Sequence, residues 1–349
     1  MNGLALEGGG AKGAYQVGAY LALVNNGIKF NWIAGTSIGA LNAALMIQNK
    51  PEKMIDLWLN TTTDIIGINS NLITKIKKKQ ISFEDLKSGF NNLKKIFKNK
   101  GIDTKPFLDV ICQNIDEKKI RNKKTKFGLV TLKLKKMTPM EITIDDIPEG
   151  KLSEYIMASC YLPFFSFKKI IDGEYYLDGG FYNNLPLQFL ENQGCETIYA
   201  IRLNSPGFKH NKLKKSTKVI EIKPKKSLGS MILFDKDSCL LNMRRGFYDA
   251  LRVVKNLDGD NYYFYHQSDQ YYERIIRKAP QELIIKLKKK YKAKTNKELV
   301  IKVVEHLLEK AEIEHLSLYN IKKKIKYLKK DDSLKKPYKE FIISCKTFW

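Results

Sequence analysis

The sequence predicts an α/β fold with a mostly parallel central sheet flanked by helices, followed by a mainly helical C-terminal extension. Two strand-turn-helix units open the chain: GLAL leads through EGGGAKG into AYQVGAYLALVNNG, and FNWIAG leads through a short turn into IGALNAALMIQNK. Units of this kind in succession are typical of a parallel sheet. From about residue 228 onward, apolar residues recur at helical spacing instead.

The first helix and two later strands can be placed from short patterns. Val17, Tyr20, Leu21 and Val24 share one helical face, and Gly27 lies where that helix would end. The stretch KFGLVTLKLKKMTPMEITI predicts two adjacent strands, and LSEYIMAS predicts a helix. TIYAIRLN is rich in β-branched and aromatic residues, which favours a further central strand.

The chain divides into two regions on this pattern, residues 1–205 and residues 206–349. Within the first, residues 72–126 are rich in lysine with apolar residues at helical spacing, so we expect helices that cover the core or form a lid. In the second, Thr295 and Glu298 predict a capping box ahead of an amphipathic helix. The later segment IKKKIKYLKK either lies on a membrane surface or packs on its own domain with its lysines in water.

Composition narrows the function classes. The chain of 349 residues has a formal net charge of +25, which attracts polyanions. Lysine predominates and aromatic residues are not interleaved with the basic runs, so we expect no nucleic acid, while an anionic lipid surface stays open. Five scattered cysteines predict neither disulfides nor a zinc site. Because no apolar run spans a bilayer and no leader pattern is present, we expect a cytoplasmic protein.

A glycine-rich loop at residues 8–13 is the first motif with chemical content. Gly8, Gly10 and Gly13 satisfy GxGxxG between a strand and a helix, which admits a dinucleotide site. However, the second strand ends in AGTSIGA without the expected acidic residue, and Lys12 is followed by glycine, unlike a phosphate-binding P-loop. Successive amides without side chains can also hold an oxyanion.

The second motif, at residues 35–39, is a GxSxG between a predicted strand and a predicted helix. This is the context of a nucleophile elbow, in which a sharp turn presents the serine. Gly35 and Gly39 would relieve the crowding around Ser37, and the helix N-terminus would stabilise negative charge. The alternative is an ordinary serine at a helix N-cap.

The histidines supply no convincing base for this serine. A serine nucleophile is ordinarily activated by a histidine that an acid orients. The chain has four histidines. His210 lies in a lysine-rich loop, His266 follows an aromatic run, and His306 and His315 fall on the predicted C-terminal helices. Only His266 is a tolerable candidate, so a carboxylate acting directly on Ser37 is the alternative.

Asp178 is the carboxylate that this alternative needs. Asp-Gly also occurs at Asp172, where it predicts a tight hairpin turn, and at Asp258, in a polar loop. Asp178 differs because it ends a predicted strand and two glycines follow it. Another turn aspartate is the competing interpretation.

In their order and context these motifs resemble the patatin-like phospholipase family. The resemblance covers roughly residues 2–204 and includes the stretch ASCYLPFF at residues 158–165, ahead of the aspartate. The C-terminal part resembles the helical extension of bacterial members less specifically. Lys12 departs from the family, which more often has arginine there.

The resemblance implies a three-layer α/β/α domain and a carboxylic ester hydrolase. Ser37 would be the nucleophile and Asp178 the proton acceptor, without histidine. The oxyanion hole would be formed in the glycine loop, and further glycines would shape the turns: Gly8, Gly9, Gly10, Ala11, Lys12 and Gly13, then Gly35, Gly39, Gly179 and Gly180.

The implied substrate is a phospholipid or another acyl-ester lipid. We expect peripheral contact with an anionic membrane, and neither a cofactor nor a metal ion. Two other classes stay open: a nucleotide- or dinucleotide-binding protein that uses the glycine loop, and a catalytically silent lipid-binding module. The sequence leaves the lipid and the oligomeric state undetermined.

Overall fold

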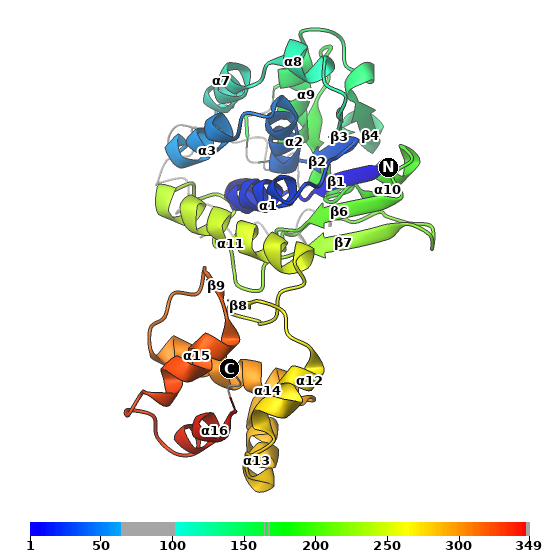
Figure 1. Ribbon diagram of the computed structural model, residues 1–349. Helices are drawn as coiled ribbons and strands as arrows, with labels where there is room; N and C mark the ends of the chain where they lie inside the picture. The colour runs from blue at the N-terminus through cyan, green and yellow to red at the C-terminus, as the bar shows by residue number, and fades with distance from the viewer. Residues whose placement is uncertain (64–101, 164, 167, 347–349) are drawn as a thin grey trace. The chain divides into compact units, whose positions relative to one another are not determined.

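The computed structural model describes residues 1–63, 102–163, 165–166 and 168–346. They form two compact units, Met1–Ala250 and Leu251–Trp349 (Figure 1). The sequence-based division at residue 205 falls earlier than this one. The difference arises because strand β7 (Lys218–Ile222) and most of helix α11 (Lys236–Val254) belong to the first unit.

The first unit is built on a seven-stranded sheet in the order β4-β3-β2-β1-β6-β7, with β5 also paired to β3. The strands other than β7 are β1 (Asn2–Leu6), β2 (Trp32–Thr36), β3 (Lys126–Lys133), β4 (Thr138–Thr143), β5 (Tyr176–Asp178) and β6 (Thr197–Ile201). Strands β3, β2, β1, β6 and β7 run parallel to one another, and β4 and β5 both run antiparallel to β3. The mostly parallel sheet is therefore confirmed, as are the strand pair after residue 126 and the central position of TIYAI.

Helices cover both faces of the sheet, which makes three layers (Figure 1). Leu6 faces α2, where it lies against Gly39, whereas the preceding residue Ala5 packs with Phe189 and Leu190 of α10. Consecutive strand residues point to opposite faces, so α2 and α10 lie on opposite sides. The helices before α11 are α1 (Ala14–Asn25), α2 (Ile38–Gln48), α3 (Pro51–Asn60), α7 (Lys105–Asn114), α8 (Glu117–Arg121), α9 (Leu152–Ser159) and α10 (Leu187–Asn192).

Two predicted turn positions are confirmed by the backbone. Gly27 follows the C-cap of α1 with φ of 81°, a conformation in which glycine avoids a steric cost. Asp172 and Gly173 have φ of 49° and 71°, as a type I′ turn requires, between the bridged residues Ile171 and Glu174. Of the helices predicted over 72–126, α7 and α8 lie in the described part, and residues 64–101 lie outside it.

The second unit is mainly helical. It contains α12 (Asp269–Ile276), α13 (Gln281–Tyr291), α14 (Asn296–Lys310), α15 (Ile321–Lys329) and α16 (Tyr338–Ser344), with a short parallel pair, β8 (Tyr263–Phe264) and β9 (Leu318–Tyr319). The Thr295 hydroxyl accepts from the Glu298 amide, as predicted, while the Glu298 carboxylate accepts from the Lys294 amide. Throughout the described ranges, no helix combines the length and the apolar character needed to cross a bilayer.

Two glycines let α1 and α11 approach each other closely. A Cβ added at Gly18 would lie 1.8 Å from the Met243 carbonyl oxygen, and one at Gly246 would lie 1.9 Å from the Tyr15 carbonyl oxygen. The Tyr15 hydroxyl also donates to the buried Asp249 carboxylate at 2.8 Å. This reciprocal contact makes α11 an integral part of the first unit.

We expect Gly246→Ala to destabilise the protein by about 2 kcal/mol or more, because the methyl group has no space. The direction of this change in the free energy of unfolding is informative, because a glycine-to-alanine substitution in an unrestrained helix stabilises the protein by about 1 kcal/mol. Urea unfolding followed by tryptophan fluorescence, to which Trp32 and Trp58 of this unit contribute, measures the change. Ser238→Ala at an exposed position of the same helix is the control. A neutral or stabilising Gly246→Ala would contradict the close contact.

Candidate active site

Ser37 lies on a sharp turn between β2 and α2. Its backbone has φ of 56° and ψ of −129°, a conformation that side-chain-bearing residues rarely adopt. A Cβ added at Gly35 would lie 2.1 Å from the Gly39 carbonyl carbon, and one at Gly39 would lie 2.4 Å from the Leu6 carbonyl oxygen. Both glycines are thus required by backbone approach, and Ser37 is presented at the start of a wholly buried helix.

A hydroxyl group from α9 holds this turn. Ser159 is fully buried, and its Oγ accepts a hydrogen bond from the Ser37 amide at 2.9 Å and donates one to the Val130 carbonyl at 2.7 Å. Ser159 therefore links the turn to β3 and stabilises the unusual backbone of Ser37. The sequence analysis noted this residue within the stretch at 158–165 but gave it no role.

Asp178 reaches the same place from the end of β5. Its amide donates to the Tyr161 carbonyl at 2.8 Å, and its Oδ1 accepts from the Gly180 amide at 2.7 Å. A Cβ at Gly179 would lie 2.2 Å from the Val130 carbonyl oxygen, so the Asp-Gly-Gly backbone passes directly against β3. The two glycines allow the aspartate to lie beside a neighbouring strand end.

The Ser37 side chain lies beside the Asp178 carboxyl group, where it favours the ionised form of that group. Asp178 is 4% exposed, and burial raises its pKa from 3.8 to about 6, although the Ser37 side chain and the hydrogen bond from the Gly180 amide oppose this rise. None of the four histidines is hydrogen-bonded to either residue in the described part of the chain, and His266 instead contacts Asp258 at 3.1 Å. The structure thus brings together the serine and the carboxylate that the sequence singled out.

Cys160 is a further neighbour that the sequence analysis did not identify as part of the site. Its thiol lies next to the Ser37 side chain. Burial, and secondarily the Asp178 charge, raise the pKa of this thiol well above its ordinary value. At neutral pH the sulfur is therefore a protonated group beside the serine. Its place next to Ser159 in the stretch ASCYLPFF at residues 158–165 was the only sequence signal.

The glycine loop passes beside Ser37, and several of its amides already have partners. The Gly8 amide donates to the Asn184 carbonyl, the Ala11 amide to Met231 and the Lys12 amide to Gly9. Among the hydrogen bonds of the described residues, none uses the amides of Gly9 or Gly10. Gly9 and Gly10 are therefore the members of the predicted oxyanion set with an available donor.

The remaining loop residues serve the surrounding packing. Gly13 precedes α1, where a Cβ would lie 2.8 Å from the Trp58 ring. Lys12 is half-buried, and burial lowers its pKa while the nearby Glu7 carboxylate opposes that change. A Cβ at Gly8 would lie 3.2 Å from the Ser37 Cβ, which shows how closely the loop approaches the serine.

A small apolar pocket opens beside Ser37. It measures about 50 Å³, room for a few water molecules, so side chains must move before a larger ligand enters. Its lining joins the loop, the turn and α7 to the 231–234 segment: Gly10, Ser37, Ile38, Phe107, Cys160, Leu162, Phe165, Met231, Ile232 and Phe234. The apolar lining suits a hydrocarbon chain better than a nucleotide.

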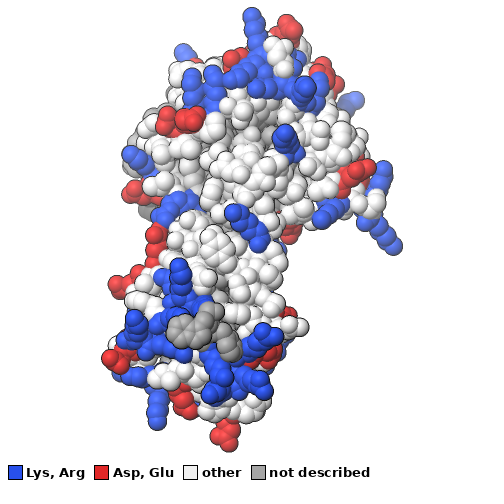
Figure 2. All heavy atoms as spheres, viewed as in Figure 1, with Lys and Arg blue, Asp and Glu red and all other residues white. Residues whose placement is uncertain are grey.

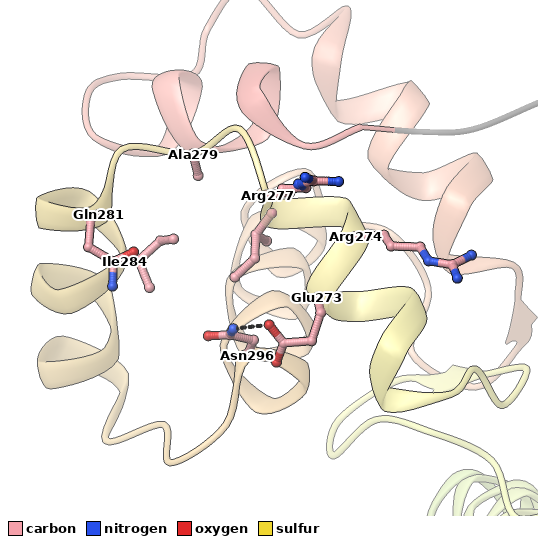
Figure 3. A pocket seen from close by; sticks show the side chains of 8 residues that line it. Glu273, Arg274, Arg277, Ala279, Gln281, Ile284 and Asn296 are labelled. Atoms are coloured by element: carbon pink, nitrogen blue, oxygen red, sulfur yellow. Dashed lines mark hydrogen bonds between the residues drawn. The ribbon is translucent and has the colours of Figure 1, made fainter.

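A larger hollow of about 320 Å³ lies in the second unit, against α12, α13 and the start of α14. Its lining includes Glu273, whose carboxylate accepts a hydrogen bond from Asn296 at 2.5 Å, and Arg274, whose guanidinium points away from the hollow (Figure 3). No serine, cysteine or histidine lines it, so it offers no nucleophile. Within the described residues, no cluster of three His, Cys, Asp or Glu side chains could hold a metal ion.

Comparison with known proteins matches the first unit. The family model for patatin-like phospholipases covers residues 4–190. Patatin-like phospholipase domain-containing protein 7 of Rattus norvegicus is 29% identical over 211 residues, 58% of this chain and 13% of that protein. Lysophospholipase nte1 of Aspergillus terreus is 26% identical over 203 residues, which cover 58% of this chain and 12% of that protein.

Neuropathy target esterase sws of Drosophila melanogaster is 27% identical over 214 residues, covering 58% of this chain and 13% of its own length. The alignments thus span only about an eighth of these relatives. Among solved structures, VipD from Legionella pneumophila aligns with a TM-score of 0.41 and 13% identity, covering 96% of this chain and 81% of that one.

We expect Asp178→Asn to stabilise the folded protein above pH 7. Because the pKa of Asp178 is raised by folding, its ionised form destabilises the folded protein. This destabilisation is absent below pH 3.8 and complete above about pH 6. A neutral amide avoids it, so the variant should gain up to about 3 kcal/mol at pH 8 and little near pH 4. Urea titrations at both pH values measure this. Asp172→Asn, in the exposed turn, is the control, and a variant destabilised at pH 8 would contradict the burial argument.

Proposed function

This chain belongs to the patatin-like phospholipase family, and on that premise we propose that it is a serine hydrolase of acyl-ester lipids. Ser37 is the nucleophile and Asp178 the general base. One observation carries the proposal: a serine on a strained turn lies beside a buried carboxyl group with a pKa of about 6. A base needs a pKa near the working pH to take a proton efficiently.

The reaction starts with proton transfer from Ser37 Oγ to the Asp178 carboxylate. The oxygen attacks the ester carbonyl carbon, and the carbonyl oxygen becomes an oxyanion. Asp178 then returns the proton to the departing alcohol as the ester bond breaks. A water molecule, deprotonated by Asp178, attacks the acyl-serine; fatty acid is released and the proton returns to Ser37.

Backbone amides provide the charge stabilisation that this reaction needs. Within the described residues, the amides of Gly9, Gly10 and Ile38 lack hydrogen-bond partners, and Ile38 begins the helix behind Ser37. The amide after a nucleophile and those of a glycine loop are the usual donors to such an oxyanion. Because the Gly8 amide is bound to Asn184, we assign the hole to these three amides.

The protonated Cys160 thiol lies beside Ser37 and does not compete with Asp178 as a base. Its raised pKa leaves Asp178 as the proton acceptor beside the serine. The pocket lined by Phe107, Leu162 and Phe234 is the proposed entrance for the acyl chain. A dinucleotide is less well accommodated, because its phosphates and riboses need polar partners and the lining of this pocket is almost wholly apolar.

We expect purified wild-type protein to release fatty acid from at least one member of a panel of phospholipids, lysophospholipids and neutral glycerides. Ser37→Ala and Asp178→Asn should each lower kcat by about three orders of magnitude or more, because each removes an essential proton-transfer partner. The wild type should also show kcat/KM rising with pH to a plateau, with the midpoint near 6, as ionised Asp178 is the active form.

The control for Asp178→Asn is again Asp172→Asn, which should retain wild-type activity. A fluorophosphonate probe should label wild-type protein and not Ser37→Ala. Full hydrolysis by Ser37→Ala would disprove the assignment. Lipid binding without hydrolysis, unaffected by both site variants, would instead identify a catalytically silent module.

We further propose that the basic face of α15 contacts an anionic membrane. The second unit has 24 Lys and Arg against 13 Asp and Glu. Ile321, Ile325 and Leu328 are buried on one side of α15. Lys322 is partly exposed, Lys323 and the half-exposed Tyr327 lie on the outside, and the exposed Lys330 follows as the C-cap residue. Figure 2 shows Lys and Arg gathered on the face where Figure 1 places α15. Lysines beside an aromatic ring suit a lipid headgroup region.

Neutralising this face should weaken vesicle binding. Lys322, Lys323 and Lys330 changed together to Gln should lower partitioning onto phosphatidylserine-containing vesicles by about two orders of magnitude, since each lysine contributes about 1 kcal/mol near such a surface. Cosedimentation measures the effect. The matched control changes Lys212, Lys215 and Lys218 of the first unit to Gln. Equal loss in both triple variants would show only a net-charge effect and would reject this surface.

A further inference from the structure

We propose that Asn184 is a positioning residue that fixes the glycine loop relative to the segment that carries Asp178, Gly179 and Gly180. This inference rests on the proposed function, because it concerns the donors of that reaction. Asn184 follows Asp178 by six residues in the chain and is 2% exposed. Its hydrogen bonds reach the loop before α1 and the segment after β6, which makes it a junction between distant parts of the first unit.

Asn184 binds both polar backbone groups of Gly8. The Gly8 amide donates to the Asn184 carbonyl at 3.1 Å, and the Asn184 Nδ2 donates back to the Gly8 carbonyl at 3.3 Å. The same Nδ2 donates to the Pro206 carbonyl at 3.2 Å, and the Asn184 amide donates to Phe208 at 2.7 Å. Gly8 is therefore held from two sides by one residue, which fixes the orientation of the amides that follow it.

Three glycines from different segments close around this side chain. A Cβ at Gly8 would lie 2.3 Å from Asn184 Oδ1, one at Gly180 would lie 3.0 Å from the same oxygen, and one at Gly207 would lie 2.5 Å from the Asn184 Cβ. The Asn184 oxygen thus lies between the glycine loop and the Asp-Gly-Gly turn. A side chain at Gly8 or Gly207 would displace Asn184, and one at Gly180 would crowd it.

Asparagine suits this position for chemical reasons. Its amide nitrogen supplies donors for two carbonyls, which an aspartate lacks, and an aspartate would also place a second carboxylate near Asp178. Glutamine is longer by one methylene and would collide with the enclosing glycines. A donor to an oxyanion must be accurately placed, so loosening Gly8 misdirects the Gly9 and Gly10 amides.

The test compares Asn184→Ala with Asn183→Ala. Asn183 is a fully buried neighbour of the same type, whose side chain binds the His210 carbonyl and Asn211, not the glycine loop. The Thr36 hydroxyl binds only the Asn183 carbonyl, which the variant retains. We expect Asn184→Ala to lower kcat by about 10- to 100-fold, with KM and the pH midpoint unchanged. Asn183→Ala should lower the melting temperature while keeping kcat within about threefold of wild type.

Amide hydrogen exchange of a peptide covering residues 2–16 gives a second readout that needs no activity. Exchange at residues 8–13 should be faster in Asn184→Ala and unchanged in Asn183→Ala. If Asn184→Ala fails to fold, Asn184→Asp keeps the size and removes the Nδ2 donor. It should show the same faster exchange and a lower kcat, together with a raised pH midpoint, because its carboxylate lies near Asp178. If the wild type itself shows no Ser37-dependent hydrolysis, the proposed function fails, while the exchange comparison still decides whether Asn184 holds the loop.

A double-variant cycle ties the effect to the contact itself. Gly8→Ala places a methyl group against Asn184 Oδ1, and Asn184→Ala removes that oxygen. The two losses in kcat should therefore be less than multiplicative when combined. Wild-type kcat in Asn184→Ala, unchanged exchange at residues 8–13, or fully multiplicative losses would each overturn the proposal.

Discussion

The site depends on close contacts around Ser37 between backbone segments, at glycines that have no side chain. Gly35 lies against Gly39, Gly39 against Leu6, and Gly179 against Val130, each with no room for a Cβ. These contacts bring the ends of β1, β2, β3 and β5 close enough for one serine side chain to lie beside one aspartate. The buried Ser159 hydroxyl then holds the Ser37 amide in its unusual conformation.

The same closeness determines the electrostatics of the site. A carboxylate at a sheet edge would ordinarily be hydrated, but at Asp178 the packed backbone and the neighbouring side chains exclude water. Burial raises its pKa to about 6, and the single Gly180 amide and the Ser37 hydroxyl only partly offset that effect. Folding therefore gives Asp178 the pKa that the proposed base needs, without a histidine.

Much of the fold could be predicted because local patterns and tertiary structure agree. The strand-loop-helix units, the turn at Asp172 and Gly173 and the cap at Thr295 each have residues that dictate the local backbone. The meeting of Ser37 and Asp178 was also predictable, through motif order more than through either motif alone. The family membership agrees with that order.

The rest depended on contacts between distant segments, which leave weak signals in a sequence. Strand β7 is half-exposed and follows the linker-like stretch SPGFKHNK, so the division predicted from the sequence, at residue 205, lies before the one between Ala250 and Leu251. Which amides of the glycine loop are already used depends on Asn184 and Met231, far along the chain. Cys160 and Ser159 gave no sign of their neighbours, because a buried cysteine or serine ordinarily only fills space.

The protonated Cys160 thiol has a consequence for how the protein responds to oxidants. Peroxide and most thiol reagents attack the thiolate, and the fraction of thiolate falls tenfold for each unit that the pKa rises. A sulfur that is buried against Asp178, with its pKa well above the ordinary value, offers almost none. The serine is thus accompanied by a sulfur that mild oxidation leaves intact, and the exposed Cys112 would react long before it.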